Sequence, residues 1–232
     1  MRSLFFSYDM EVDTAYIIRI KGHELSERKA NECLSSCRTV GMQAQFWDAY
    51  DGTGGEIIAP EHLKDHPTMK MIKVTDHYLV KAEIACALSH IGLWAKCVEQ
   101  DKPLVILEHD AVMIAPYKNH RVYNSICYLG CIEQAKGGWK VVATPVHGSD
   151  GPNYHFLLRT HAYAIDPAVA KNMLAYVLQQ GICGQLDRLL RADLFPIHQM
   201  GLVAFDDHEN LTSINGKTEE YRSSRRNDNL EF

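Results

Sequence analysis

Short apolar runs alternate with amphipathic stretches along this chain. A β-branched and aromatic run at 14–20 predicts a buried strand, and small or apolar residues at helical spacing predict a helix from Ser26, in the N-cap position, to about Thr39. A second strand is expected at 43–49, before an Asp-Gly turn. From 81 to about 100 the apolar residues recur at helical spacing, which predicts a long amphipathic helix. An apolar strand then ends at Glu108.

The same alternation continues through the second half of the chain. Strands are expected at 139–144, 156–158 and 163–165, and a helix is expected to begin near Pro167, a residue that suits the first helical turn. Strands alternating with helices indicate an α/β fold with a mostly parallel sheet flanked by helices. We expect one domain over 1–216 and a charged, flexible tail over 217–232, where apolar periodicity is weak.

Composition narrows the class of protein further. With 46% hydrophobic and 23% charged residues, the 232-residue chain reads as a globular protein, and its net charge of -5 gives no overall attraction to nucleic acid or anionic membranes. No apolar stretch approaches the roughly 18 residues of a membrane span, and no signal peptide is recognisable, so a cytoplasmic location is expected.

The cysteines indicate a reduced protein. Their number, seven, is odd, which favours free thiols over a disulfide framework. Cys33 and Cys37 are four residues apart, as are Cys127 and Cys131, and this spacing places each pair on one face of a helix. We expect small core residues at these positions rather than zinc ligands, which more often stand two residues apart.

Two carboxylates stand where the strand at 104–108 ends. Because side chains alternate along a strand, Glu108 and Asp110 are expected on one side and His109 on the other. Paired carboxylates suit Mg²⁺ or Mn²⁺ bound together with a phosphorylated ligand, and ligands gather beyond the carboxyl ends of parallel strands. The alternative is a strand end that simply turns polar at the surface.

Several segments, in order, resemble glycosyltransferase family 25, which includes lipopolysaccharide and lipooligosaccharide galactosyltransferases and collagen galactosyltransferase domains. The similar segments are Tyr16-Ile17-Ile18, Asp48-Ala49-Tyr50-Asp51-Gly52, the run from Glu83 to Ser89-His90, Leu107-Glu108-His109-Asp110, Ala162-Tyr163-Ala164-Ile165, and Asp187. The resemblance implies a GT-A type, Rossmann-like fold. It also implies metal-dependent, inverting transfer of a hexose, galactose or glucose first, from a UDP-sugar to an acceptor hydroxyl, with a lipopolysaccharide-type glycan as the leading acceptor. The family usually has Glu-Asp-Asp where this chain has Glu108-His109-Asp110.

The resemblance, together with side-chain chemistry, gives a set of candidate site residues. Asp110 and Glu108 are the expected metal ligands, and His208 is a third, with Asp206 and Asp207 competing for its role. Asp187 is the expected general base, with His155, His161 and Asp150 as alternatives. The residues expected to contact the nucleotide-sugar are Arg19, Asp48, Asp51, Glu83, Ser89, His90 and Glu108.

Structural roles remain open for four of these residues. Asp51 before Gly52 is equally well explained by turn formation, Glu83 and His90 by a polar stripe that ties a helix to the sheet, and Asp187 by a position near a helix start.

Alternative functions also remain open. The acceptor could be a modified nucleobase or a protein, although the acidic composition does not favour nucleic acid. His109 in the acidic motif raises the alternative of a catalytically weakened nucleotide-sugar-binding protein, and an unrelated α/β nucleotide-binding module is a further alternative.

Overall fold

A six-stranded sheet forms the centre of the protein. The computed structural model describes residues 12, 14–117, 125–130, 160–199 and 202–206. The sheet order is β2-β1-β3-β6-β5-β7. Its strands are β1 (Ala15–Arg19), β2 (Ala44–Asp48), β3 (Leu104–Glu108), β5 (Ile126–Tyr128), β6 (Ala162–Ile165) and β7 (Ile197–Gln199). β6 runs antiparallel to both of its neighbours, whereas the other pairs are parallel, so the predicted mostly parallel sheet is confirmed.

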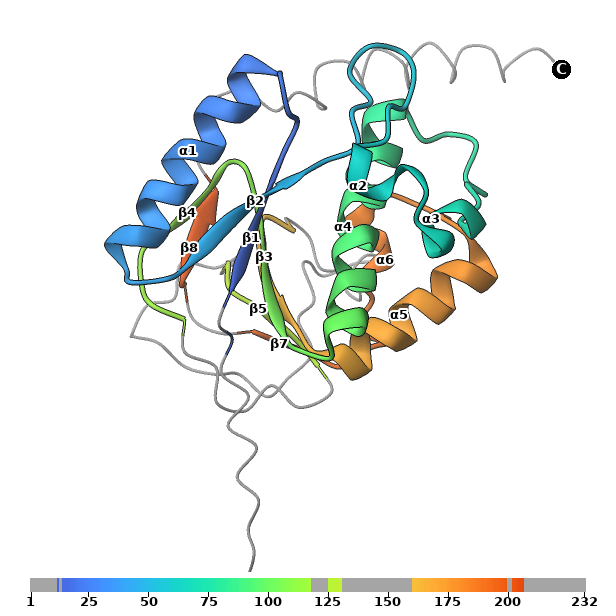
Figure 1. The fold of residues 1–232 in the computed structure, drawn as a ribbon. Helices are drawn as coiled ribbons and strands as arrows, with labels where there is room; N and C mark the ends of the chain where they lie inside the picture. Colours follow the sequence, from blue (N-terminus) through green and yellow to red (C-terminus); the bar gives the residue numbers. More distant parts are fainter. Residues whose placement is uncertain (1–11, 13, 118–124, 131–159, 200–201, 207–232) are drawn as a thin grey trace, which may run out of the picture.

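Helices cover both faces of this sheet (Figure 1). α1 (Glu24–Thr39) lies on one face together with a small antiparallel sheet of β4 (Ala111–Met113) and β8 (Ala204–Asp206). The long α4 (Lys81–Gln100) and α5 (Pro167–Gln180) pack on the other face. Three short helices are α2 (Glu61–Lys64), α3 (Pro67–Met71) and α6 (Leu186–Leu189). The predicted α/β class is therefore confirmed.

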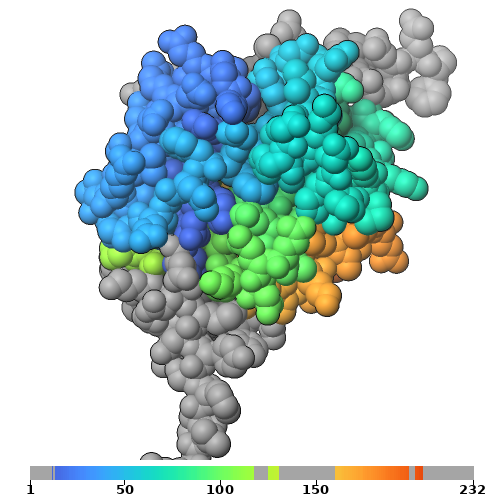
Figure 2. Space-filling view, in the orientation of Figure 1, coloured from blue at the N-terminus to red at the C-terminus, as the bar shows by residue number. Residues whose placement is uncertain are grey.

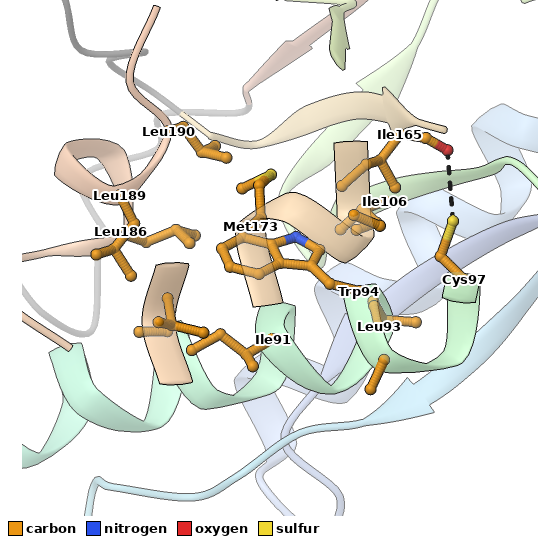
Figure 3. Packing of buried hydrophobic residues seen from close by; sticks show 14 of the residues in the cluster. Ile91, Leu93, Trp94, Cys97, Ile106, Ile165, Met173, Leu186, Leu189 and Leu190 are labelled. Atoms are coloured by element: carbon orange, nitrogen blue, oxygen red, sulfur yellow. Dashed lines mark hydrogen bonds between the residues drawn. The ribbon is translucent and has the colours of Figure 1, made fainter. Parts of the chain in front are cut away.

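Strict alternation of side chains gives the sheet two apolar layers. In β3, Ile106 joins the layer under α4 and α5, while its neighbours Val105 and Leu107 join the layer under α1. Trp94 of α4 is at the centre of the first layer, with Met173 of α5 close by (Figure 3). A sheet that helices cover on both faces requires strands whose side chains are apolar on both faces.

Most of the predicted elements that the structure describes are confirmed. α4 has the bounds that the apolar spacing predicts, and α5 begins at Pro167, preceded by Asp166 as its N-cap. The N-cap of α1 is His23, three residues before the predicted N-cap Ser26, and its Nδ1 accepts the Ser26 N–H at 3.3 Å. The strands predicted at 139–144 and 156–158, and the tail over 217–232, lie outside the described residues.

One helix-face prediction was wrong. Cys127 lies in β5, inside a run that is buried on both faces, so the four-residue spacing to Cys131 has no helical meaning. Cys33 and Cys37 do share a face of α1, where both are buried in the core as predicted.

Residues 50–80, between β2 and α4, form a continuous part of the surface above α4 (Figure 2). Ile58, Met71 and Tyr78 are exposed within this segment. Among the residues that the structure describes, no helix is both long enough and apolar enough to cross a membrane.

Candidate functional site

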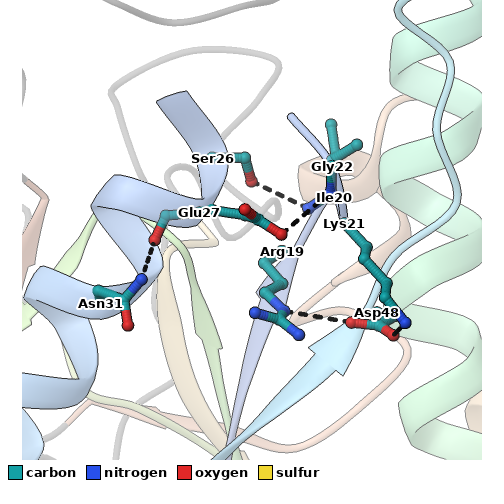
Figure 4. A network of polar contacts seen from close by, with 8 residues as sticks. All are labelled: Arg19, Ile20, Lys21, Gly22, Ser26, Glu27, Asn31 and Asp48. Atoms are coloured by element: carbon teal, nitrogen blue, oxygen red, sulfur yellow. Dashed lines mark hydrogen bonds and ion pairs between the residues drawn. The ribbon is translucent and has the colours of Figure 1, made fainter. Parts of the chain in front are cut away.

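The ends of three parallel strands meet at one edge of the sheet. In the register of β1 with its neighbours, Arg19 stands opposite Asp48 of β2, and Ile18 stands opposite Glu108 of β3. Arg19 Nε donates to Asp48 Oδ1 at 3.1 Å, and Lys21 Nζ lies 3.7 Å from Asp48 Oδ2 (Figure 4). The two predicted nucleotide contacts on β1 and β2 are therefore neighbours, and they pair with each other.

A pocket opens beside these strand ends, between β3, α4 and the loop after β2. Its open space, counting the part continuous with solvent, is about 530 Å³. It is lined by Ile18, Ile20, Ala49, Tyr50, Gly52, Thr53, Ala82, Ala85, Cys86, Ser89, His90, Glu108 and His109. Three of the predicted contacts, Ser89, His90 and Glu108, thus come together in one cavity.

The loop after β2 is fixed against α4. Ser89 Oγ accepts the Tyr50 N–H at 2.9 Å and donates to the Ala85 carbonyl at 2.7 Å. Asp51 Oδ1 accepts from the Thr53 backbone N–H at 2.8 Å and from its hydroxyl at 2.7 Å, which is the turn geometry given above as the alternative for this residue. Ser89 and Asp51 therefore hold the shape of the pocket wall.

Glu108 is an anion inside this pocket. Thr160 Oγ1 donates to its Oε1 at 2.7 Å, and His90 Nε2 lies 3.6 Å from the same oxygen. Burial acts to raise the pKa of Glu108, but the neighbouring His90 imidazole, together with the Thr160 hydroxyl, outweighs burial and lowers this pKa to about 2. At neutral pH the carboxylate is ionised.

Two further carboxyls lie close to Glu108. Asp110 follows β3 in the turn before β4, and its Oδ1 is buried with no hydrogen-bond partner among the described residues. Burial first, and then the charge of Glu108, raise the pKa of Asp110. Asp187 lies in the first turn of α6, the helix-start position considered above, and its Oδ1 is also buried without a partner in the described part of the chain. Burial raises the pKa of Asp187, and the charges of Glu108 and Glu83 add to this effect.

Glu83 connects α4 to the segment before α6. Its carboxylate accepts the N–H of Val80, the N-cap of α4, at 3.0 Å and so caps this helix. It also accepts a hydrogen bond from the Gln185 side chain. Glu83 does not line the pocket described above. Its position favours the structural role, in which a buried carboxylate ties the helix to its surroundings.

Cys86 lines the pocket, although the sequence analysis did not single it out. Burial raises the pKa of the Cys86 thiol well above its ordinary value, and the charges of Glu108, Asp187, Asp110 and Glu83 act in the same direction. The signal was present in the sequence, because a residue three after Glu83 and four before His90 lies on their helix face.

Two groups of side chains have donor sets that suit a cation. Glu108 and Asp110 offer carboxylate oxygens. Asp110 Oδ1, which no described residue hydrogen-bonds, is the kind of buried acceptor that Mg²⁺ or Mn²⁺ would satisfy. Ligand atoms of Cys86, His90 and Glu108 also lie within 4.8 Å of one another, a mixed set that suits borderline metals such as zinc. His208, the third predicted ligand, lies outside the described residues, and the side chain of Asp206 is not described either.

Of the three alternative general bases, the structure describes one. His161 is buried, with its Nε2 3.4 Å from the Ala204 carbonyl, whereas Asp150 and His155 lie outside the described residues.

Comparison with known proteins places this chain among the glycosyltransferases. A family model described as glycosyltransferase family 25, lipopolysaccharide biosynthesis protein, matches residues 13–125. The match spans β1 through β4 and includes Glu108 and Asp110, and it confirms both the resemblance to this family and the enzyme class.

The search of curated proteins found no match. Among solved structures, the galactosyltransferase LgtC in complex with donor and acceptor sugar analogues is similar at 9% sequence identity, with a TM-score of 0.40, covering 80% of this chain and 72% of LgtC.

Proposed function

We propose that this glycosyltransferase transfers a hexose, galactose or glucose, from a UDP-sugar to an acceptor hydroxyl with inversion, using Mn²⁺ or Mg²⁺. The observation that carries the proposal is the buried Asp110 Oδ1, which has no hydrogen-bond partner in the described part of the chain. It lies beside the ionised Glu108, at the carboxyl ends of parallel strands and next to a pocket. A GT-A type arrangement of the fold is part of this proposal.

In the proposed site, Asp110 and Glu108 hold the cation, with His208 as a third ligand. The metal would neutralise charge on the departing diphosphate, an effect typically worth several kcal/mol of transition-state stabilisation. Ser89 and the loop through Tyr50 and Thr53 form the wall against which the donor lies.

The other four residues predicted to contact the donor must change their present hydrogen-bond partners in order to do so. Arg19 can turn from Asp48 toward a phosphate, since charge-assisted hydrogen bonds favour such an exchange of partners. Asp48, Asp51 and Glu83 remain proposed nucleotide contacts. To bind the nucleotide, each carboxylate must release a present hydrogen bond, from Arg19, Thr53 and Val80 respectively.

Asp187 is the proposed general base. Its raised pKa makes it a better proton acceptor than an exposed carboxylate, and its proximity to Glu108 and Glu83 keeps it near the donor. Asp187→Asn should keep donor binding and lose transfer to an acceptor. Full turnover in Asp187→Asn would remove it as the base.

The proposed acceptor is a glycan of lipopolysaccharide type, in line with the description of the matching family. Cysteines in the described part of the chain are free thiols, which supports the proposed cytoplasmic compartment. A protein or modified nucleobase remains the alternative acceptor.

His109, which lines the pocket in place of the family's middle acid, favours a second candidate function, a nucleotide-sugar-binding protein with weakened catalysis.

The central test is release of UDP from UDP-galactose and UDP-glucose, with Mn²⁺ and with chelator. We expect metal-dependent release that Asp110→Asn abolishes. Asp65→Asn, which changes an exposed carboxylate paired with Lys70, is the matched control and should release UDP normally. Tight UDP-sugar binding without release across acceptor panels would favour the binding protein, and no binding of any UDP-sugar would disprove both functions.

A further inference from the structure

A buried hydrogen-bond chain leads from the core to the pocket. Tyr163 Oη lies 2.9 Å from Trp94 Nε1 and 2.9 Å from His90 Nδ1. His90 and Trp94 are one turn apart on α4, Tyr163 projects from β6, and all three are fully buried. The imidazole and phenol rings are stacked at 5.7 Å between centroids and 12° between planes. This packing leaves the three polar groups little freedom to choose other partners.

The chemistry of the three groups determines which atom carries each hydrogen. The indole N–H can only donate, so Tyr163 Oη accepts from Trp94. The phenol hydrogen then needs an acceptor, and His90 Nδ1 is the one within hydrogen-bond distance among the described residues. If Nδ1 donated instead, the buried phenol hydrogen would be left unsatisfied, which is costly in the interior. His90 Nδ1 therefore accepts, and neutral His90 carries its proton on Nε2.

His90 Nε2 lies on the side of the ring that is near Glu108, and both residues line the pocket. Nε2 is buried and has no hydrogen-bond partner among the described residues. Glu108 Oε1 lies 3.6 Å from Nε2, which is beyond hydrogen-bond distance, and it already accepts from Thr160. Because both His90 and Glu108 line the pocket, a ligand hydroxyl between them could accept from Nε2–H and donate to the carboxylate.

We propose that Trp94 and Tyr163 are positioning residues that hold His90 as the Nε2–H tautomer, so that His90 and Glu108 together bind one hydroxyl of a sugar-containing ligand. The donor–acceptor pair selects a hydroxyl because a phosphate oxygen could accept from His90 but could not donate to Glu108. This inference rests on the proposed function, which supplies the ligand class.

The same tautomer excludes His90 from the mixed metal group. A histidine nitrogen that binds a metal must be unprotonated, so Nε2 ligation alongside Cys86 and Glu108 would move the proton to Nδ1. The Tyr163 hydrogen would then lose its acceptor. The hydrogen-bond chain and a metal at Cys86, His90 and Glu108 are therefore opposing arrangements of the same atoms.

The first experiment measures the tautomer directly by ¹⁵N NMR of the metal-free protein labelled at histidine. The His90 signals are identified among the twelve histidines by their loss in His90→Gln. We expect an unprotonated Nδ1 and a protonated Nε2 in the wild type, and loss of this preference in Tyr163→Phe. A wild-type His90 protonated at Nδ1, or an Nε2 that loses its proton and takes a metal-bound shift on addition of Zn²⁺, would overturn the proposal.

The second experiment measures UDP-glucose binding with Mn²⁺. Tyr163→Phe should weaken binding by about three- to tenfold, the usual range for one neutral hydrogen bond, without changing the Mn²⁺ requirement. Tyr128→Phe is the matched control, because Tyr128 is equally buried and stands opposite Tyr163 in the sheet, and it should bind normally.

A third pair of variants keeps the proposal testable if Tyr163→Phe does not fold. His90→Gln retains an N–H donor and should bind UDP-glucose better than His90→Ala, whereas equal losses would contradict the donor role. If the wild type shows the expected tautomer but binds neither UDP-glucose nor UDP-galactose, the proposed function fails while the assignment of the hydrogen-bond chain stands.

Discussion

Gly52 shows how a single residue shapes the pocket. A Cβ at this position would lie 2.6 Å from the Lys81 carbonyl carbon and 2.8 Å from the Ala82 nitrogen, which are backbone atoms at the start of α4. The absence of a side chain therefore allows the loop after β2 to touch the helix, and this contact closes one wall of the cavity.

We predict that Gly52→Ala destabilises the protein by about 1–3 kcal/mol, since neither backbone segment can yield as a side chain would. The urea midpoint measures the loss. Gly54→Ala is the control two residues away, where a Cβ would meet nothing within 4 Å. Equal midpoints for the two variants would show that the loop relaxes freely.

At the same scale, residue chemistry predicted which side chains could act but not how they are paired. Ser89, His90 and Glu108 reach the pocket as expected, because helix and strand periodicity fixes their direction. The tautomer of His90 depends on Tyr163, which is 73 positions away in the chain. The same limit applies to Asp51, for which the sequence left turn formation and nucleotide contact equally open and the structure shows the turn hydrogen bond.

Among the elements, length decided which could be predicted. The 20 residues of α4 repeat their apolar pattern often enough to fix both of its ends. By contrast β4, β5, β7 and β8 have three residues each, too few for any period, and their formation depends on pairing with distant segments. Short strands therefore follow from tertiary contacts rather than from local pattern.

The start of α5 provides a test at this scale. Asp166 Oδ1 accepts the Ala168 N–H at 2.8 Å, just before Pro167 at the first helical position. Asp166→Ala should lower the free energy of unfolding by about 0.5–2 kcal/mol because the Ala168 N–H loses its acceptor. Asp166→Asn keeps the capping oxygen and should lose much less. Denaturant unfolding followed by circular dichroism compares the two, and a similar loss in both variants would mean that the negative charge matters rather than the cap.

For the whole molecule, the sheet joins two cores. Ile106 and Leu107 are consecutive, fully buried residues of β3 that face opposite apolar layers. If the layers unfold together, Ile106→Ala and Leu107→Ala should each shift one common transition, with losses of about 2–5 kcal/mol. Tryptophan fluorescence and far-ultraviolet circular dichroism should give coincident urea curves in both variants. Separate transitions in either one would show that the two layers unfold independently.

The chain's alternation of strands and helices predicted the α/β class but not the reversal of β6. Nothing local marks that reversal, because residues 162–165 are apolar on both faces in either direction. Strand direction is decided by the path of the chain between strands, which a residue pattern does not record.

The reversal of β6 has its own consequence for the pocket. A parallel strand brings the residues that follow it to the edge where ligands bind, but an antiparallel strand brings the residues that precede it. Leu107 pairs with Ala162, the Glu108 N–H donates to the His161 carbonyl at 2.8 Å, and Thr160 reaches the Glu108 carboxylate. Changes of specificity by mutation should therefore be sought upstream of this strand, where the chain enters the sheet, and downstream of β1, β2 and β3.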